Sequence, residues 1–151
     1  MPISDITAII QWWATILFIG IITTPVTIRI FPSFFDKGYI FGKILGIVLL
    51  SYILFVLGEL RLVPFSALGS YIVLYALAGL SIYSVWRNKT RCATLLKSQW
   101  KLYLVYEILF FSALFFWSFV RGHQPDVNGL EKFMDFGFVN SILRGTYFPP
   151  Q

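Results

Sequence analysis

Four long apolar stretches, separated by short polar segments, dominate the chain. They cover Ile6–Ile28, Tyr39–Leu60, Leu62–Trp86 and Leu102–Val120. Because a helix rises about 1.5 Å per residue, each stretch is long enough to cross roughly 30 Å of hydrocarbon. Membrane β-strands would instead alternate polar and apolar residues over about ten positions. The pattern therefore predicts an all-α integral membrane protein, with four transmembrane helices in residues 1–120.

The remaining segment, residues 121–151, starts with polar residues and predicts one further helix over Leu130–Arg144. Pro149 and Pro150 follow this helix and cannot continue it. The helix has more apolar residues than free solvation would allow: Phe133, Phe136, Phe138, Val139, Ile142 and Leu143. We therefore expect an amphipathic helix that lies against the membrane surface or against other helices.

The composition narrows the classes of function. Hydrophobic residues make up 58% of the chain and charged residues 13%, whereas a typical soluble domain has about 25% charged residues. With a mean hydropathy of +0.76, the chain is not a disordered protein, a basic nucleic-acid-binding domain or a water-soluble enzyme. A single cysteine, Cys92, excludes an internal disulfide framework. The first expected partner is the lipid bilayer.

The distribution of the basic residues explains the net charge of +5. Short cytoplasmic segments of membrane proteins are rich in lysine and arginine. Seven of the twelve basic residues lie between the first and second or the third and fourth stretches, and an eighth, Lys43, lies near the start of the second. The eight are Arg29, Lys37, Lys43, Arg87, Lys89, Arg91, Lys97 and Lys101. We expect a multi-pass protein of the cell membrane whose N-terminus, Glu59–Pro64 turn and tail are extracytoplasmic. Binding of anionic lipid headgroups by residues 87–101 is a less favoured interpretation of the same charges.

Glu107 is an acidic residue inside the fourth apolar stretch. A charge at that depth costs about 3 kcal/mol unless a partner or water reaches it. Lys43 lies near the same end of the second stretch, at a comparable depth. We therefore predict that Glu107 faces the other helices and pairs with Lys43. A role in proton relay is disfavoured, because it would need a second acid at a similar depth.

Glu131 and Asp135 are four residues apart in the tail, so a helix places both carboxylates on one face. Their repulsion would be offset by a divalent cation, by Lys132 or Arg144, or by the positive end of the helix dipole. The dipole together with simple solvation is the simpler explanation. Two polar residues before the helix are weaker candidates for a ligand or a general base: His123 and Asp126.

The tail resembles a known membrane family. The residues that carry the resemblance are Arg121, Pro125, Gly129, Glu131-Lys132, Met134-Asp135-Phe136, Phe138, Asn140, Leu143-Arg144 and Phe148-Pro149-Pro150. They are similar to the signature of the YYY family, large uncharacterised membrane proteins of bacteria and archaea named for a tyrosine triplet. Phe133 and Leu130 depart from the family's usual Pro and Thr, and the triplet is absent. The chain is thus expected to be the N-terminal part of a longer protein, with the missing C-terminal membrane segment as a partner.

The YYY family is in turn distantly similar to membrane glycosyltransferases that use polyprenyl-phosphate sugars. In those enzymes an acidic residue in an external loop just after a helix acts at the reaction centre. The resemblance implies that Asp135 is a catalytic base or metal ligand and that Glu131 is its partner, with a divalent cation as the candidate cofactor. It also implies that four residues contact substrate or phosphate: Lys132, Arg144, Arg121 and His123. A piece of this length is expected to be inactive alone.

A non-catalytic membrane module is the main alternative function. Its four helices would pack with a partner subunit, and the tail helix would dock on that subunit. The 16 phenylalanines and eight tyrosines suit this role equally well. A transporter is disfavoured, because the chain shows no inverted repeat and few ionisable residues within its apolar stretches.

Overall fold

The computed structural model describes residues 3–87, 89–123 and 130–147, and within them it contains helices and no strands. The helices are α1 (Ile3–Ile30), α2 (Tyr39–Glu59), α3 (Ala67–Arg87), α4 (Lys89–Gly122) and α5 (Leu130–Arg144). The first four are long and apolar enough to cross a membrane. The predicted all-α fold with four candidate transmembrane helices is therefore confirmed, and α5 begins and ends at the predicted residues.

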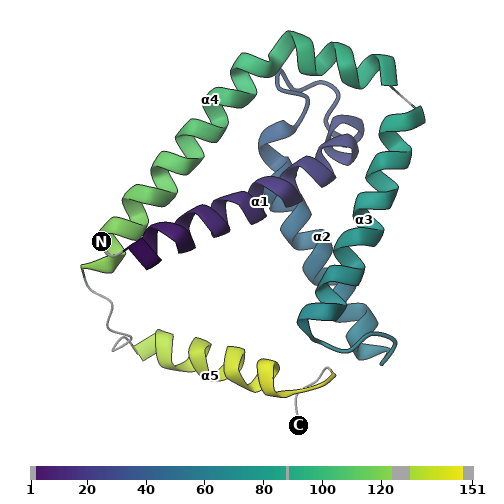
Figure 1. Ribbon diagram of the computed structural model, residues 1–151. Helices are drawn as coiled ribbons and strands as arrows, with labels where there is room; N and C mark the ends of the chain where they lie inside the picture. The colour runs from purple at the N-terminus through teal and green to yellow at the C-terminus, as the bar shows by residue number, and fades with distance from the viewer. Residues whose placement is uncertain (1–2, 88, 124–129, 148–151) are drawn as a thin grey trace.

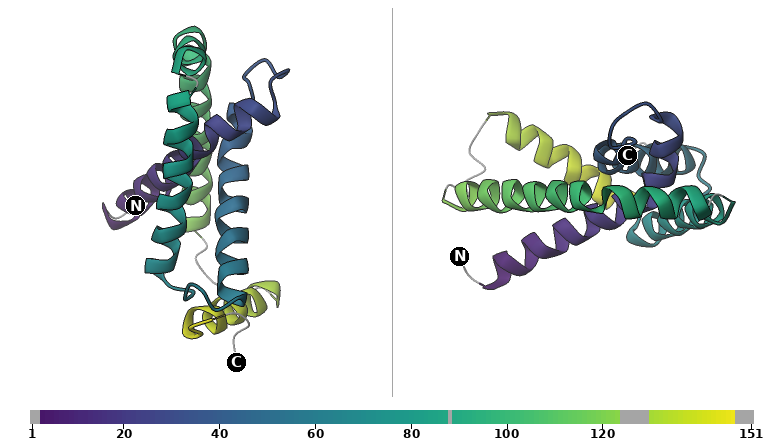
Figure 2. Two further views of the ribbon diagram at one scale, coloured as in Figure 1. Left: turned by 90° about the vertical axis from the view of Figure 1, so that its right-hand side faces the viewer. Right: turned by 90° about the horizontal axis from the view of Figure 1, so that it is seen from above.

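Helices α1 to α4 run in alternating directions through the bundle (Figure 1). The end of α1, the start of α2, the end of α3 and the start of α4 lie together at one end of the bundle (Figures 1 and 2). We call this the basic end, because the two lysine-rich and arginine-rich segments lie there. The turn between α2 and α3 lies at the opposite end, the tail end, together with α5, which runs crosswise to the bundle (Figure 2).

Helix α4 begins at Lys89, well before the Leu102 predicted from hydropathy. The polar segment of residues 89–101, which was predicted to separate the third and fourth transmembrane helices, is therefore part of α4. An apolar pattern marks where hydrocarbon begins, whereas lysine, leucine and glutamine are good helix formers on either side of that boundary. Figure 1 shows that the first turns of α4 run at an angle to the rest of the helix.

Helix α3 begins at Ala67, later than the predicted Leu62. Pro64 interrupts the apolar stretch, because proline has no N–H to donate within a helix. Ser66 then caps α3, since its hydroxyl oxygen accepts a hydrogen bond from the Gly69 N–H at 3.2 Å. The residues before Ala67 therefore form the turn at the tail end.

Helices α1 and α2 pack closely along small residues. A Cβ atom at Gly46 would lie 2.5 Å from Ile19 Cγ2 and 2.9 Å from Thr23 Oγ1. The Thr23 hydroxyl donates a hydrogen bond to the Gly42 carbonyl across the interface at 2.6 Å. Gly42 and Gly46 have the spacing of the GxxxG motif, which lets two helix backbones approach each other in a membrane.

Gly46→Ala should destabilise the bundle, because the added methyl group would overlap Ile19 and Thr23. Overpacking of this kind costs about 1–3 kcal/mol, which would lower the midpoint of unfolding in detergent. Gly79→Ala is the matched control, since a Cβ atom there would meet nothing within 4 Å. Its midpoint should be unchanged or slightly raised, because alanine is the better helix former. Equal midpoints for the two variants would contradict the close packing of α1 on α2.

Candidate functional site

An ion pair joins α2 to α4 near the basic end. Lys43 Nζ lies 2.8 Å from Glu107 Oε2, and the two side chains are 14% and 13% exposed. Both residues lie in helices that are candidates to span the membrane. The pairing predicted from their similar depth is thus present, and it spares each charge from standing alone in hydrocarbon.

Each member of the pair has a second partner. The Tyr39 hydroxyl donates a hydrogen bond to Glu107 Oε1 at 2.8 Å, so both carboxylate oxygens are occupied. The Lys43 ammonium group lies 3.8 Å from the centre of the Phe110 ring, which is a cation–π geometry. We call Tyr39, Lys43, Glu107 and Phe110 the intramembrane polar cluster.

Aromatic and amide side chains extend this cluster toward the basic end. The Tyr39 and Tyr103 rings stack with their centroids 4.1 Å apart and their planes 16° apart. The Tyr103 hydroxyl lies 3.2 Å from Gln99 Oε1 and 3.4 Å from the Asp36 carbonyl oxygen. The Gln99 amide donates a hydrogen bond to the Phe35 carbonyl at 2.7 Å. These side chains hold α4 to the start of α2 and to the segment before it.

Asp36 is a buried acid that was not among the residues predicted from the sequence. It is 1% exposed, and its carboxylate accepts hydrogen bonds from the N–H groups of Gly38 at 3.0 Å and Ile40 at 2.9 Å. The first N–H groups of a helix have no partner within the helix, so Asp36 caps the start of α2. An Asp two residues before a Gly, directly ahead of an apolar stretch, was the signal that could have identified this cap.

The intramembrane polar cluster is suited to holding helices together. Its two charges neutralise each other, and its carboxylate already accepts bonds at both oxygens. Among the described residues, no second carboxylate is hydrogen-bonded to Glu107. The geometry therefore supports the structural interpretation of Glu107 and gives no support to a proton relay.

The tail acids lie at the other end of the molecule, on α5 (Figure 1). Asp135 is exposed. Positions 131, 132 and 135 are three and four residues apart, which places them on one side of the helix. The side chains of Glu131 and Lys132 lie outside the described residues, as does Asp126. No group of three or more potential metal ligands occurs in the described part of the chain, so the cation and the acid pair stay predictions.

The other three predicted contact residues are not brought to Asp135 by the described structure. Arg144 ends α5 nine residues after Asp135, so it lies on the opposite side of that helix. Arg121 lies in the last turn of α4. His123 follows α4, where its Nδ1–H donates to the Phe119 carbonyl at 2.8 Å and its ring meets the Phe119 ring edge-on. These contacts tie His123 to the last turn of α4, and its role as a ligand, a general base or a substrate contact stays a prediction.

The backbone just after α5 is tied to the turn between α2 and α3. The Phe65 N–H donates a hydrogen bond to the Thr146 carbonyl at 2.8 Å. Large apolar side chains of α5 are nevertheless exposed: Met134, Phe136, Phe138, Val139 and Leu143. The helix is thus anchored at the tail end with apolar surface uncovered, while its amphipathic character stays a prediction.

One comparison with known proteins identifies a family. A family model described as uncharacterized membrane protein (DUF2298) matches residues 49–151, about two thirds of the chain. The match covers the second half of α2 and all of α3, α4 and α5. No curated protein and no solved structure has a significant match to the chain. The match shows that the chain is a membrane protein of an uncharacterised family. The membership of the YYY family and the similarity to glycosyltransferases stay predictions.

A double-mutant cycle on the ion pair should show strong coupling. Lys43→Met or Glu107→Leu alone leaves one charge without its partner, which costs about 3 kcal/mol of the free energy of unfolding. The double variant should lose much less than the sum of the two, because no unpaired charge remains. Denaturant titration in detergent measures all four proteins, with the exposed Glu59→Gln as a control that should be silent. Additive losses would show that the pair contributes nothing.

Proposed function

The chain belongs to the uncharacterized membrane protein family DUF2298, and from the resemblance of its tail to the YYY family we propose that it forms the membrane region of a glycosyltransferase that uses a polyprenyl-phosphate sugar. Asp135 is the proposed general base or metal ligand, with Glu131 as its partner and a divalent cation as the cofactor. Further membrane helices, implied by the resemblance to the YYY family, would supply the site for the sugar donor.

The observation that carries this proposal is the position of α5. The helix lies crosswise at the tail end of the bundle (Figure 2), and both Asp135 and several large apolar side chains are exposed on it. A helix with uncovered apolar residues at the end of a membrane bundle is suited to the bilayer surface. The phosphate of a polyprenyl carrier would lie at that same level, within reach of an acid on α5.

The chemistry requires groups of the types that α5 contains. An acceptor hydroxyl must lose its proton to a base, which a carboxylate can take up. The departing lipid phosphate needs a cation or a basic residue to stabilise its developing charge. Lys132 is the preferred phosphate contact, because position 132 shares a side of α5 with position 135 whereas Arg144 lies opposite. Arg121 and His123, at the end of α4, remain weaker candidates for contacts with the substrate.

A non-catalytic module is the second candidate function. It is favoured by the exposed apolar residues of α5, such as Phe136, Phe138 and Leu143. In this role α5 would dock on a partner subunit, and the acids would serve only to keep the helix soluble at its edges. The two functions differ in which residues of α5 matter.

Asp135→Asn in the full-length protein should abolish sugar transfer. Removing a general base typically costs a factor of about 10²–10⁴ in rate, and Glu131→Gln should give a smaller loss. The assay follows a radiolabelled sugar from its polyprenyl-phosphate carrier into acceptor in membranes that contain each variant. Ser141→Ala, an exposed substitution on the same helix, is the matched control and should transfer at the normal rate.

Normal transfer by the Asp135→Asn and Glu131→Gln variants would exclude the catalytic role of these acids. The module would then be favoured if Phe136→Ala with Phe138→Ala released a co-purifying membrane subunit. If the Asp135→Asn and Glu131→Gln variants kept that subunit, the acids would have no part in docking, and the module would be distinguished from the enzyme.

We also propose that the basic end faces the cytoplasm. The two segments at that end contain eight of the twelve basic residues, and short cytoplasmic segments are enriched in lysine and arginine. The tail end has the remaining four: Arg61, Arg121, Lys132 and Arg144. On this orientation the N-terminus and α5 are extracytoplasmic, where the acids on α5 would meet a lipid-linked sugar.

Single cysteines at the two ends should differ in their reaction with a membrane-impermeant maleimide. With Cys92→Ser as the background, Leu62→Cys at the tail end should be labelled in intact cells. Lys97→Cys at the basic end should react only after the cells are opened. Both positions are exposed, so access to each depends on the side of the membrane. The reverse pattern would invert the proposed orientation.

A further inference from the structure

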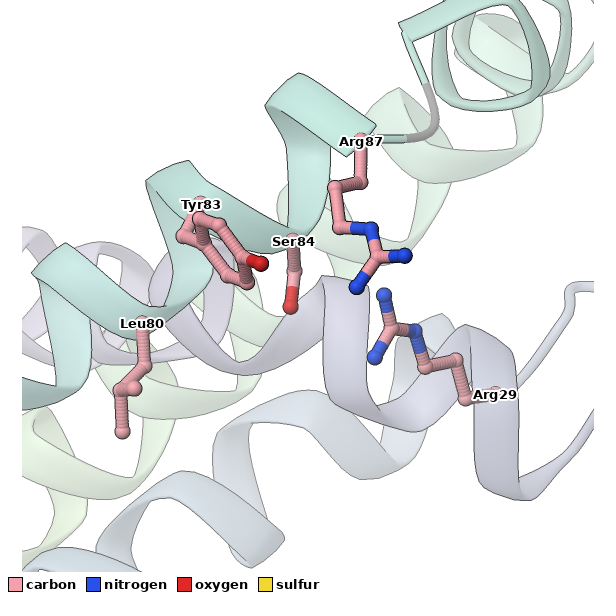
Figure 3. Close-up of a pocket in the computed structure, with 5 residues that line it drawn as sticks. All are labelled: Arg29, Leu80, Tyr83, Ser84 and Arg87. Atoms are coloured by element: carbon pink, nitrogen blue, oxygen red, sulfur yellow. The ribbon is translucent and has the colours of Figure 1, made fainter.

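Two arginine side chains from different helices converge at the basic end. Arg29 lies in the last turn of α1 and Arg87 in the last turn of α3. Figure 3 shows their guanidinium groups pointing toward each other across the gap between the helices. They line an open pocket of about 510 Å³ together with Leu80, Tyr83 and Ser84. We call this the arginine pocket.

The positive charge of the arginine pocket is not balanced by a carboxylate among the described residues. Both carboxylates at the basic end are engaged elsewhere. Glu107 is paired with Lys43, and Asp36 caps α2 through both of its oxygens. Two guanidinium groups that approach each other repel unless an anion lies between them. The pocket therefore has the charge of a site for an anion.

The groups that line the pocket suit a phosphate. A guanidinium group presents its N–H donors as a planar fork that matches two oxygens of a phosphate. Two forks from opposite walls can hold one phosphate from both sides. Tyr83 and Ser84 add hydroxyl groups to the lining, and hydroxyls can also donate to phosphate oxygens.

The position of the pocket relative to the bilayer selects the kind of phosphate. Arg29 and Arg87 lie at the ends of two candidate membrane-spanning helices, which is the level of the lipid headgroups. Leu80, seven residues before Arg87, lies about 10 Å deeper along α3. Its side chain is exposed, so a lipid chain can lie along α3 directly below the pocket.

We propose that the arginine pocket binds the phosphate of an anionic membrane lipid, with the guanidinium forks of Arg29 and Arg87 on the phosphate oxygens and the acyl chains along α3. The site lies at the opposite end of the bundle from α5, so it does not depend on the proposed sugar transfer. Two other roles would not require the two guanidinium groups to converge. One is a favourable interaction of each arginine with the dipole of its own helix, and the other is to set the orientation of the chain in the membrane.

Arg29→Gln and Arg87→Gln should each weaken the binding of phosphatidylglycerol about fivefold. In the double variant the two factors should multiply. Native mass spectrometry counts the phosphatidylglycerol and phosphatidylcholine molecules retained by the purified chain. The control is Lys97→Gln with Lys101→Gln, which makes the same change of charge at the same end of the bundle and should bind normally. Unchanged midpoints of thermal unfolding in detergent verify that each variant is folded.

Arg29→Lys with Arg87→Lys keeps the net charge and removes both forks, so it should also weaken binding. Three results would overturn the proposal. One is full retention of phosphatidylglycerol by the lysine variant, and another is an equal loss in the Lys97 and Lys101 control. The third concerns the source of the phosphate. If inorganic phosphate stabilised the chain in phosphatidylcholine without any anionic lipid, and if the double glutamine variant lost this stabilisation, the pocket would be a site for a soluble anion.

Discussion

A charge inside hydrocarbon must find its partner within the protein, and the pair of Lys43 and Glu107 meets that requirement here. The pair also determines how α4 is placed. Helix α4 packs mainly on α1 and α3, so long side chains provide much of its link to α2. Glu107 reaches Lys43 and Tyr39 only when one particular face of α4 is turned inward. A single acid, largely shielded from solvent, thereby selects the rotation of the segment 102–120 of α4, which is otherwise predominantly apolar.

The ion pair depends in turn on the close approach of α1 to α2. A Cβ atom at Gly20 would lie 2.9 Å from Lys43 Cγ, so the absence of a side chain on α1 makes room for the lysine stem. At the preceding position of α2, Gly42 lies against the Gly20 carbonyl, and the Thr23 hydroxyl donates a hydrogen bond to the Gly42 carbonyl. Small residues that bring two backbones together thus also position the charge that holds the fourth helix. Packing and electrostatics in this bundle are not independent contributions.

The features that the sequence predicted are those that leave a signal along one stretch of chain. Four apolar runs gave the number of spans, and the similar depths of Lys43 and Glu107 were enough to pair them. The starts of α3 and α4 were misplaced, because hydropathy follows the lipid boundary whereas Pro64 and the helix-forming residues before Leu102 determine where helix exists. The arginine pocket was out of reach, since the convergence of Arg29 and Arg87 depends on how α1 meets α3. The first and last residues of α5 were predictable from the sequence. Which groups its acids face was not, because that depends on how α5 packs against the rest of the protein.

The acidic residues at the two ends of the bundle have different environments, and this difference bears on how the net positive charge is balanced. At the basic end both Asp36 and Glu107 are engaged internally, so neither carboxylate balances the charge of Arg29 and Arg87. At the tail end Asp135 is exposed on α5, and cations or hydroxyl groups can reach it. The phosphate of an anionic lipid in the arginine pocket and a lipid-linked sugar near α5 would therefore lie in opposite leaflets and would not compete. On this proposal the membrane itself, rather than an acidic protein partner, supplies the anions that balance the excess of positive charge.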